Sequence, residues 1–159
     1  MEKVLNNSYF VGETNVLTSN GYCSIENVTT ECEVLDGNNE FQYVKEVQKS
    51  TTNEILELTT IDGTIFRATK NQFFMVTQKK KGIFTVPQRK MLCKLKKDDF
   101  LVSHYEYDGS GHIYYQYEAI KSIKTIQETK EVFNIILENN HSFVVDGKIV
   151  YDNSMLVNA

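Results

Sequence analysis

Hydrophobic and polar residues alternate in short runs along most of the chain, the pattern of strands that are buried on one side. Val, Ile, Thr, Tyr and Phe dominate these runs. The runs predict strands at 32–35, 41–49, 54–60, 64–68, 73–76, 83–86, 100–104, 114–126, 132–137 and 142–145. Asn-Gly or Asp-Gly turn dipeptides, typical of hairpins, begin at Asn20, Asp36, Asp62, Asp108 and Asp146.

A helical period of 3.6 residues is not sustained over any long segment. Segments 24–28 and 88–95 are predicted to hold a helical turn or two. The chain has 159 residues, of which 41% are hydrophobic, and this length suits one domain with one core. We therefore expect a single all-β domain.

The most linker-like segment is 108–112 (DGSGH), small and polar between two aromatic β segments. Three interpretations stay open for it. It is an ordinary loop, the remnant of a deleted insertion, or the point where two natural fragments have been joined.

Composition narrows the class of protein further. The apolar runs are too short to span a membrane, and no secretory signal pattern opens the chain. The three cysteines are odd in number and lack the spacing of a zinc site. We expect a cytoplasmic, disulfide-free monomer with no membrane partner, cofactor or metal.

Charge is unevenly distributed along a chain whose net charge is −4. Segment 67–97 holds ten Lys and Arg residues and no Asp or Glu. Such a stretch is a nucleic-acid footprint, a solvated face, or a surface complementary to an acidic part of the same chain. The solvated face is the commonest of the three, so nucleic acid is the less favoured partner.

Three separated blocks, in order, resemble the inteins, proteins of the Hint domain family. The first is SYFVGETNVLTSNGYCSIENV (8–28), with a nucleophile followed by a Gly-acid-Thr element. The second is DGTIFRATKNQFFMV (62–76), similar to a block that usually has Thr-x-x-His. The third is VFNIILENNHSFVVDGKIVYDNS (132–154), similar to a closing block with His-x-Phe and a terminal Asn before Ser, Thr or Cys. Between them, LCKLKKDDFLVS (92–103) is similar to a further family segment.

The resemblance implies an all-β Hint fold: a single flattened, horseshoe-like domain of curved strands and hairpins. It also implies autocatalytic protein splicing. Ser8 would attack the carbonyl of Asn7 and convert the peptide into an ester. Ser154 would then take the acyl group, and Asn153 would cyclise to a succinimide and release the element. An acyl shift would leave Asn7 joined to Ser154.

The domain boundaries follow from this chemistry. Residues 1–7 would be a stub of the N-terminal host segment (the N-extein), 8–153 the Hint domain, and 154–159 a stub of the C-extein. Because Ser8, Asn153 and Ser154 must react with one another, they are expected to converge in space. Thr69 and Gln72 are the candidates for holding the junction carbonyl.

The flanks resemble a known insertion site. Joined, they contain Lys-x-x-x-Asn-Ser-x, from Lys3, Asn7 and Ser154, similar to a motif of family B DNA polymerases; 156–157 stand where that motif continues Tyr-Gly. This match selects Ser8 as the first residue, whereas spacing to Thr14 alone favours Tyr9.

With serine at both junctions, the chain resembles the cysteine-independent split inteins of bacteriophage DNA polymerases. The exteins would then be its partners, together with a complementary fragment if the element is naturally split near 108–112.

The chain departs from the family pattern at three positions. Gln72 stands where the second block has His, and a Gln amide donates a hydrogen bond but cannot deliver a proton near neutral pH. Asn134 replaces an Asp that often assists the nucleophiles, and Asp152 replaces the penultimate His. Thr69 and His141 match the pattern, which makes His141 the best remaining general acid or base.

Each of these residues has an ordinary structural explanation when it is taken alone, and only the ordered set favours splicing. Two alternatives of other classes remain. One is a Hint-like autoprocessing domain that cleaves without ligating, against which the Ser after Asn153 argues. The other is a non-catalytic β-module that binds nucleic acid through segment 67–97.

Overall fold

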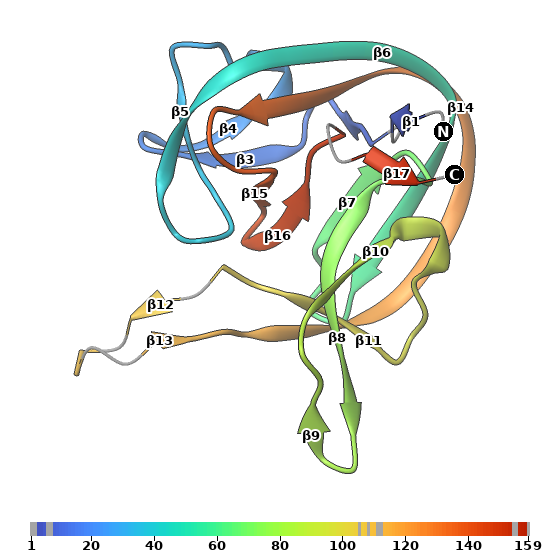
Figure 1. Cartoon of the computed structure of the whole chain (residues 1–159). Coiled ribbons are helices and arrows are strands. Elements are labelled where there is room, and N and C mark those ends of the chain that lie inside the picture. Colours follow the sequence, from blue (N-terminus) through green and yellow to red (C-terminus); the bar gives the residue numbers. More distant parts are fainter. Residues whose placement is uncertain are drawn as a thin grey trace.

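The structure is a computed structural model that describes residues 3–5, 8–104, 106–107, 109–110, 113–153 and 156–158. The described residues form strands and two short 3₁₀ turns, in agreement with the predicted all-β class (Figure 1). In chain order the elements are β1 (Lys3–Leu5), β2 (Phe10–Val11), β3 (Asn15–Thr18), β4 (Gly21–Ser24), η1 (Ile25–Asn27), β5 (Glu33–Leu35), β6 (Phe41–Thr60), β7 (Ile65–Ala68), β8 (Phe73–Lys80), β9 (Ile83–Phe84), β10 (Gln88–Met91), η2 (Leu92–Lys94), β11 (Asp99–Val102), β12 (Glu106–Tyr107), β13 (Ile113–Tyr114), β14 (Tyr117–Leu137), β15 (Ser142–Val145), β16 (Lys148–Tyr151) and β17 (Leu156–Asn158).

Two very long strands dominate the architecture. The predicted strands 41–49 and 54–60 are one strand, β6. The predicted strand 132–137 and residues 117–126 of the predicted strand 114–126 belong to one strand, β14, whereas Tyr114 belongs to β13. β6 and β14 pair with each other antiparallel along most of their length and curve together around the molecule (Figure 1). Polar residues at 50–53 interrupted the hydrophobic pattern but not the strand, because ladder hydrogen bonds use backbone groups that every residue supplies.

The strands close into a ring that is not a regular barrel. Neighbouring strands follow the order β8, β11, β14, β2, β7, β6, β5, β3, β15, β16. β16 then pairs back with β8 through Val150 and Phe74, which closes the ring. β14 and β6 also pair directly, so the ring is bridged across one side.

The two predicted helical segments are only partly helical. Segment 24–28 contains η1, but in segment 88–95 the first half is strand β10, paired with β8, and only η2 is helical. Ile25 and Leu92 explain the short turns, because each is fully buried and anchors its turn in the core. No helix in the described part of the chain is long and apolar enough to cross a membrane.

Positive φ angles mark the hairpin turns. Asp146 (45°) and Gly147 (79°) close the β15–β16 hairpin, as their dipeptide predicted. Lys81 (52°) and Gly82 (80°) close β8 and β9 in the same way, and the sequence analysis did not identify this turn. Asp108, of the predicted turn at 108, lies outside the described residues.

Four phenylalanines lie at the centre of the core: Phe10, Phe66, Phe74 and Phe143, all almost fully buried. Their rings pack edge to face at centroid distances of 5.6 to 6.3 Å. Burial of each ring stabilises the fold by about 1.5–3 kcal/mol. Their strands adjoin the predicted site residues in the chain: β2 follows residues 8–9, β7 precedes and β8 follows residues 69–72, and β15 follows residue 141. The aromatic cluster therefore fixes the segments that carry the predicted site.

Candidate functional site

The two ends of the chain lie side by side. β1 pairs with β17 antiparallel, with Leu5 opposite Leu156 and Lys3 opposite Asn158. Figure 1 shows both short strands next to each other in front of the long curved strands. β1, which precedes Ser8 in the chain, therefore lies beside β17, which follows Asn153.

Ser8 and Tyr9 lie against a tight turn that residues 69–72 form. The turn closes where the backbone N–H of Gln72 donates to the Thr69 carbonyl at 3.1 Å. The fully buried Ser8 hydroxyl donates to the Asn71 carbonyl at 3.1 Å. Tyr9 and Thr69 bind each other through Tyr9 N–H to Thr69 Oγ1 at 3.1 Å and Thr69 N–H to the Tyr9 carbonyl at 2.9 Å. The first predicted nucleophile is thus fixed by the second block.

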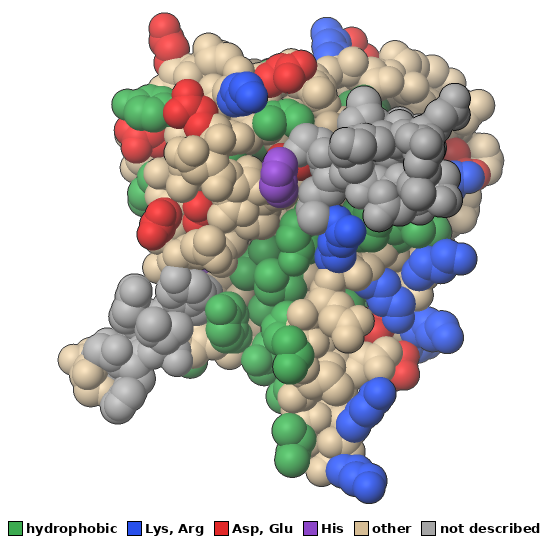
Figure 2. All heavy atoms as spheres, in the orientation of Figure 1, with side chains coloured by type: hydrophobic (Ala, Val, Ile, Leu, Met, Phe, Trp, Pro, Cys, Tyr) green, Lys and Arg blue, Asp and Glu red, His purple; other side chains and the backbone are tan. Residues whose placement is uncertain are grey.

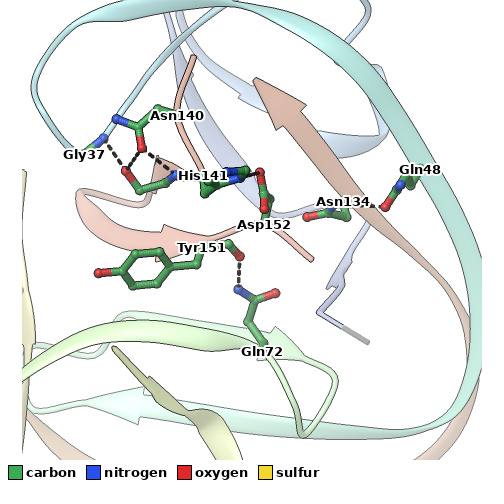
Figure 3. Close-up of polar contacts among 9 residues, drawn as sticks. Gly37, Gln48, Gln72, Asn134, Asn140, His141, Tyr151 and Asp152 are labelled. Atoms are coloured by element: carbon green, nitrogen blue, oxygen red, sulfur yellow. Dashed lines mark hydrogen bonds and ion pairs between the residues drawn. The ribbon is translucent and has the colours of Figure 1, made fainter. Parts of the chain in front are cut away.

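Gln72 extends the same turn to the C-terminal end of the domain. Its Nε2 donates to the Tyr151 carbonyl at 2.8 Å (Figure 3). It also donates to the Phe73 carbonyl at 3.0 Å. The side chain is fully buried, and its Oε1 has no hydrogen-bond partner among the described residues. Asn153, two residues beyond Tyr151, is also buried. One turn therefore contacts segments that are about 145 residues apart in the chain.

His141 and Asp152 form a pair directly before Asn153. His141 Nδ1 lies 3.5 Å from Asp152 Oδ2, and the Asp152 backbone N–H donates to the His141 carbonyl at 2.8 Å. The two side chains differ in exposure to solvent: that of His141 is 60% exposed and that of Asp152 is 1% exposed. Figure 3 shows the imidazole directed at the carboxylate. The pair connects a solvent-exposed titratable ring to a buried carboxylate.

Hydrogen bonds hold the start of the hairpin that carries this pair. Ser142 pairs with Tyr151 in the β15–β16 register. The Asn140 Oδ1 accepts from both the Ser142 N–H and hydroxyl, at 3.1 and 3.0 Å. The Ser142 oxygen accepts from the backbone N–H of Gly37 at 3.0 Å (Figure 3). These bonds fix the backbone on both sides of His141.

Asn134 lies on β14 opposite Gln48 of β6, and its Nδ2 donates to Gln48 Oε1 at 3.1 Å. The side chain is buried, and within the described part of the chain its Oδ1 has no hydrogen-bond partner. A neutral amide held by another neutral amide cannot take up a proton at ordinary pH. Asn134 can therefore orient a neighbour through an accepted hydrogen bond, but it cannot act as a base.

The structure brings together most of the predicted site. Thr69 and Gln72 belong to one turn, to which Ser8 is hydrogen-bonded. Gln72 connects this turn to the strand that leads to Asp152 and Asn153. Asn7 and Ser154 lie outside the described residues. Two further residues contribute backbone carbonyls: Asn71, a neighbour of Gln72 to which the sequence assigned no position in the site, and Tyr151, which no motif singled out. No sequence pattern marks such contacts, because every residue has a carbonyl.

A cleft of about 340 Å³ opens beside the 69–72 turn. Residues 69–71 and Tyr9 form one side, and Val132 and the polar middle of β6, residues 50–54, form the other. The cleft gives solvent a route to the turn that holds Ser8. Among the residues that the structure describes, no group of three or more His, Cys, Asp or Glu side chains is placed to hold a metal ion.

The basic stretch 67–97 lies over β8, β9, β10 and η2, where Figure 2 shows Lys and Arg side chains gathered on one part of the surface. Two of its cations are neutralised locally, Arg67 by Glu57 at 2.8 Å and Lys90 by Asp99 at 2.9 Å. Lys79 and Arg89 lie over the rings of Phe84 and Phe73. Part of the stretch thus has structural partners within this chain.

Comparisons with known proteins identify the fold. No family model matches the chain, and no curated protein matches it in sequence. Solved structures do match. The DnaB intein from Synechocystis sp. PCC 6803 superposes with a TM-score of 0.72 at 19% identity, over 91% of this chain and 98% of that one. An intein-like domain from Clostridium thermocellum gives 0.68 at 24% identity, over 91% and 98%. The DnaX mini-intein from Spirulina platensis gives 0.68 at 21% identity, over 91% and 99%. The chain therefore has the Hint/intein-like fold, as its sequence blocks predicted.

Proposed function

We propose that this chain is a self-splicing element that excises residues 8–153 and joins Asn7 to Ser154. One observation supports the proposal above the others. A single turn, 69–72, holds Ser8 through the Asn71 carbonyl and holds the segment before Asn153 through Gln72. Splicing needs this convergence, because its acyl transfers occur only between groups within bonding distance.

The first step is an acyl shift at Ser8. The Ser8 oxygen attacks the Asn7 carbonyl carbon, the new C–O bond replaces the C–N bond, and the Ser8 nitrogen takes the hydroxyl proton. A Ser hydroxyl is a weak nucleophile that requires activation. The Asn71 carbonyl accepts the hydroxyl hydrogen bond, which orients the Ser8 oxygen but is too weakly basic to remove the proton. We therefore expect a slow first step.

The later steps occur at the other junction. The Ser154 oxygen attacks the carbonyl carbon of the Asn7 ester, the bond from that carbon to the Ser8 oxygen breaks, and the Ser8 oxygen takes up the proton that Ser154 loses, which leaves a branched chain. The Nδ2 of Asn153 then attacks its own backbone carbonyl, the bond to residue 154 breaks, and a succinimide forms. Cyclisation needs one proton removed from Nδ2 and one delivered to the leaving amine. The His141–Asp152 pair, whose Asp152 directly precedes Asn153, is our candidate for moving them.

The proposal also covers the flanking segments, the host protein and the place of a natural break in the chain. Residues 1–7 and 154–159 are proposed to be extein stubs, with a family B DNA polymerase as host protein in the cytoplasm. The element acts as a monomer, since every proposed group comes from one chain. Segment 108–112 lies between β12 and β13, which form a two-stranded sheet of their own among the strands that the structure describes. A natural break there would leave the ring of strands complete, which is what a split intein requires.

Intact mass spectrometry of the purified chain tests the function. Splicing predicts a free element of residues 8–153 ending in a succinimide or Asn, together with the joined peptide MEKVLNNSMLVNA. The Asn153→Ala variant should accumulate unspliced or branched chain. A parent chain that keeps its full mass under all conditions, without ester or branch, would refute the proposal.

Two alternatives are outcomes of the same measurements. A domain that only cleaves would release both flanks without ever producing the joined peptide. A nucleic-acid-binding module would leave the chain intact and bind duplex DNA with an affinity that falls steeply with salt. The grouped basic side chains over β8 to η2 are the observation that keeps this second alternative in the test.

A further inference from the structure

Gln72 occupies the position of the general acid that acts on the first junction in the resembling family. In this chain its donor group is directed elsewhere. Both hydrogen bonds of Nε2 go to backbone carbonyls, and the shorter one, at 2.8 Å, goes to Tyr151. The contact with the N-terminal end is made by other members of the turn, Thr69 and Asn71. The side chain of Gln72 therefore serves the C-terminal end of the domain.

The other polar atom of the Gln72 amide, Oε1, is a hydrogen-bond acceptor. Oε1 is buried, and within the described part of the chain it has no hydrogen-bond partner. A buried acceptor left in this state costs stability relative to a satisfied one. Such costs are concentrated at functional sites, where the missing partner is present at another stage of the reaction. Asn153 follows two residues after Tyr151, which Gln72 holds, and its carboxamide has two N–H donors.

On the premise of the splicing function, we propose that Gln72 is a positioning residue for asparagine cyclisation rather than for the first acyl shift. Nε2 holds the Tyr151 carbonyl, which fixes the strand end from which Asn153 follows. Oε1 accepts a hydrogen bond from Asn153 Nδ2 in the reactive conformation and directs its nitrogen at the backbone carbonyl. A misplacement of about 1 Å at this point costs on the order of 10²-fold in rate.

The chemistry balances without a proton on Gln72. The Nδ2–C bond of the succinimide forms as the bond between Asn153 and residue 154 breaks. Nδ2 loses one proton, and the leaving α-amine gains one. Gln72 only donates and accepts hydrogen bonds throughout, as its amide permits.

The test separates the two junctions by using two parent backgrounds. In a Ser8→Ala background only cleavage after Asn153 occurs, and mass spectrometry follows release of the C-terminal stub. In an Asn153→Ala background cleavage after residue 153 is blocked while the Asn7 ester still forms, at Ser8 or after transfer to Ser154, and hydroxylamine cleavage of that ester after residue 7 measures the first acyl shift. Gln72→Met, similar in length but without polar atoms, should slow the first reaction about 10- to 100-fold. It should change the second less than about twofold.

A second variant addresses misfolding and a merely structural role. Gln72→Glu retains the shape of the side chain, and its carboxyl regains a donor only when protonated. Its cleavage rate relative to the Gln72 parent should therefore rise about tenfold or more as the pH falls from about 8 to about 5, because burial raises a carboxyl pKa toward that range. Gln78→Met is a matched control, since Gln78 also donates from a part-buried amide, to Asp99 at 2.9 Å. It should leave both junction reactions unchanged.

Three outcomes would overturn the role. Gln72→Met could reduce the upstream ester as much as the downstream cleavage. Gln72→Glu could show no pH rescue relative to the parent. Parents in both backgrounds could be inert, which would refute the splicing function itself and would be recognised by the absence of either reaction before Gln72 is changed.

Discussion

Tyr9 and Thr69, sixty residues apart in the chain, hold each other through two reciprocal hydrogen bonds: Tyr9 N–H to Thr69 Oγ1 at 3.1 Å and Thr69 N–H to the Tyr9 carbonyl at 2.9 Å. This pair attaches the residue after Ser8 to the 69–72 turn. The Ser8 hydroxyl donates to a carbonyl of the same turn, that of Asn71.

Removal of the Thr69 hydroxyl should therefore affect the first junction. Thr69→Ala deletes the acceptor of the Tyr9 N–H, at a cost of about 1 kcal/mol in stability. In the Asn153→Ala background we expect hydroxylamine-sensitive ester to form about tenfold more slowly, since Ser8 is less well oriented. Thr69→Ser keeps the hydroxyl and should behave as the parent. Equal rates for Thr69→Ala and Thr69→Ser would contradict the prediction.

The His141–Asp152 pair predicts an effect at the second junction. His141→Ala should slow cleavage after Asn153 by about 10²-fold or more, within the usual range for loss of a general acid or base. Asp152→Asn should slow it less, because the imidazole remains but loses its carboxylate partner. Release of the C-terminal stub in the Ser8→Ala background is the measurement.

A matched control is available for the histidine. His104 Nδ1 lies 3.2 Å from the Gly147 carbonyl, away from Asn153 in the fold. His104→Ala should leave the rate after Asn153 within about twofold of the parent, as expected for a substitution outside the reacting groups. If it slows cleavage as much as His141→Ala does, the effect is structural.

Asp99 predicts a pH dependence of stability. Its carboxylate is fully buried and binds Lys90 Nζ at 2.9 Å, and the Gln78 amide and the Lys96 backbone N–H also donate to it. Burial raises the pKa of Asp99, but these three donors together outweigh burial and hold the pKa below its ordinary value. The stabilisation is thus present above the unfolded-state pKa of about 3.9 and is lost as pH falls through the lower folded-state pKa.

Urea unfolding at several pH values tests this sign. Asp99→Asn should lower the free energy of unfolding by about 1–3 kcal/mol at neutral pH, the size of a hydrogen bond to a charged group. The difference between parent and variant should shrink as the pH drops below about 4. A constant difference across this range would show that ionisation of Asp99 does not stabilise the fold.

The loop between β12 and β13 predicts where the chain tolerates a break. Fragments that divide within 108–112 should reassemble on mixing, because β14 in the second fragment pairs with β11, β2 and β6 of the first. We expect the joined peptide to appear only after mixing, by mass spectrometry. A break after Thr125, inside the pairing of β14 with β6, is the control. It should abolish reassembly, and equal recovery from both breaks would contradict this placement.

Local chemistry could be predicted from the sequence because it depends on neighbouring residues. Alternating hydrophobicity predicted the all-β class, and Asp146-Gly147 predicted its own turn, since a left-handed backbone needs these residue types. The ordered blocks around Ser8, Thr69 and Asn153 predicted the fold. The interrupted pattern at 50–53, in contrast, hid the continuity of β6, because that continuity depends on its partner β14.

The residues of this chain by themselves determined which candidate groups it offers for the proposed reaction and the order in which they occur: two serines, the asparagine at position 153 and one histidine. Only the tertiary structure decided what each of them contacts. It placed Ser8 on the Asn71 carbonyl and turned the Gln72 donor toward Tyr151. Backbone carbonyls and closure of the ring carry no local signature, because they arise when distant strands pair and bring uniform main-chain groups beside particular side chains.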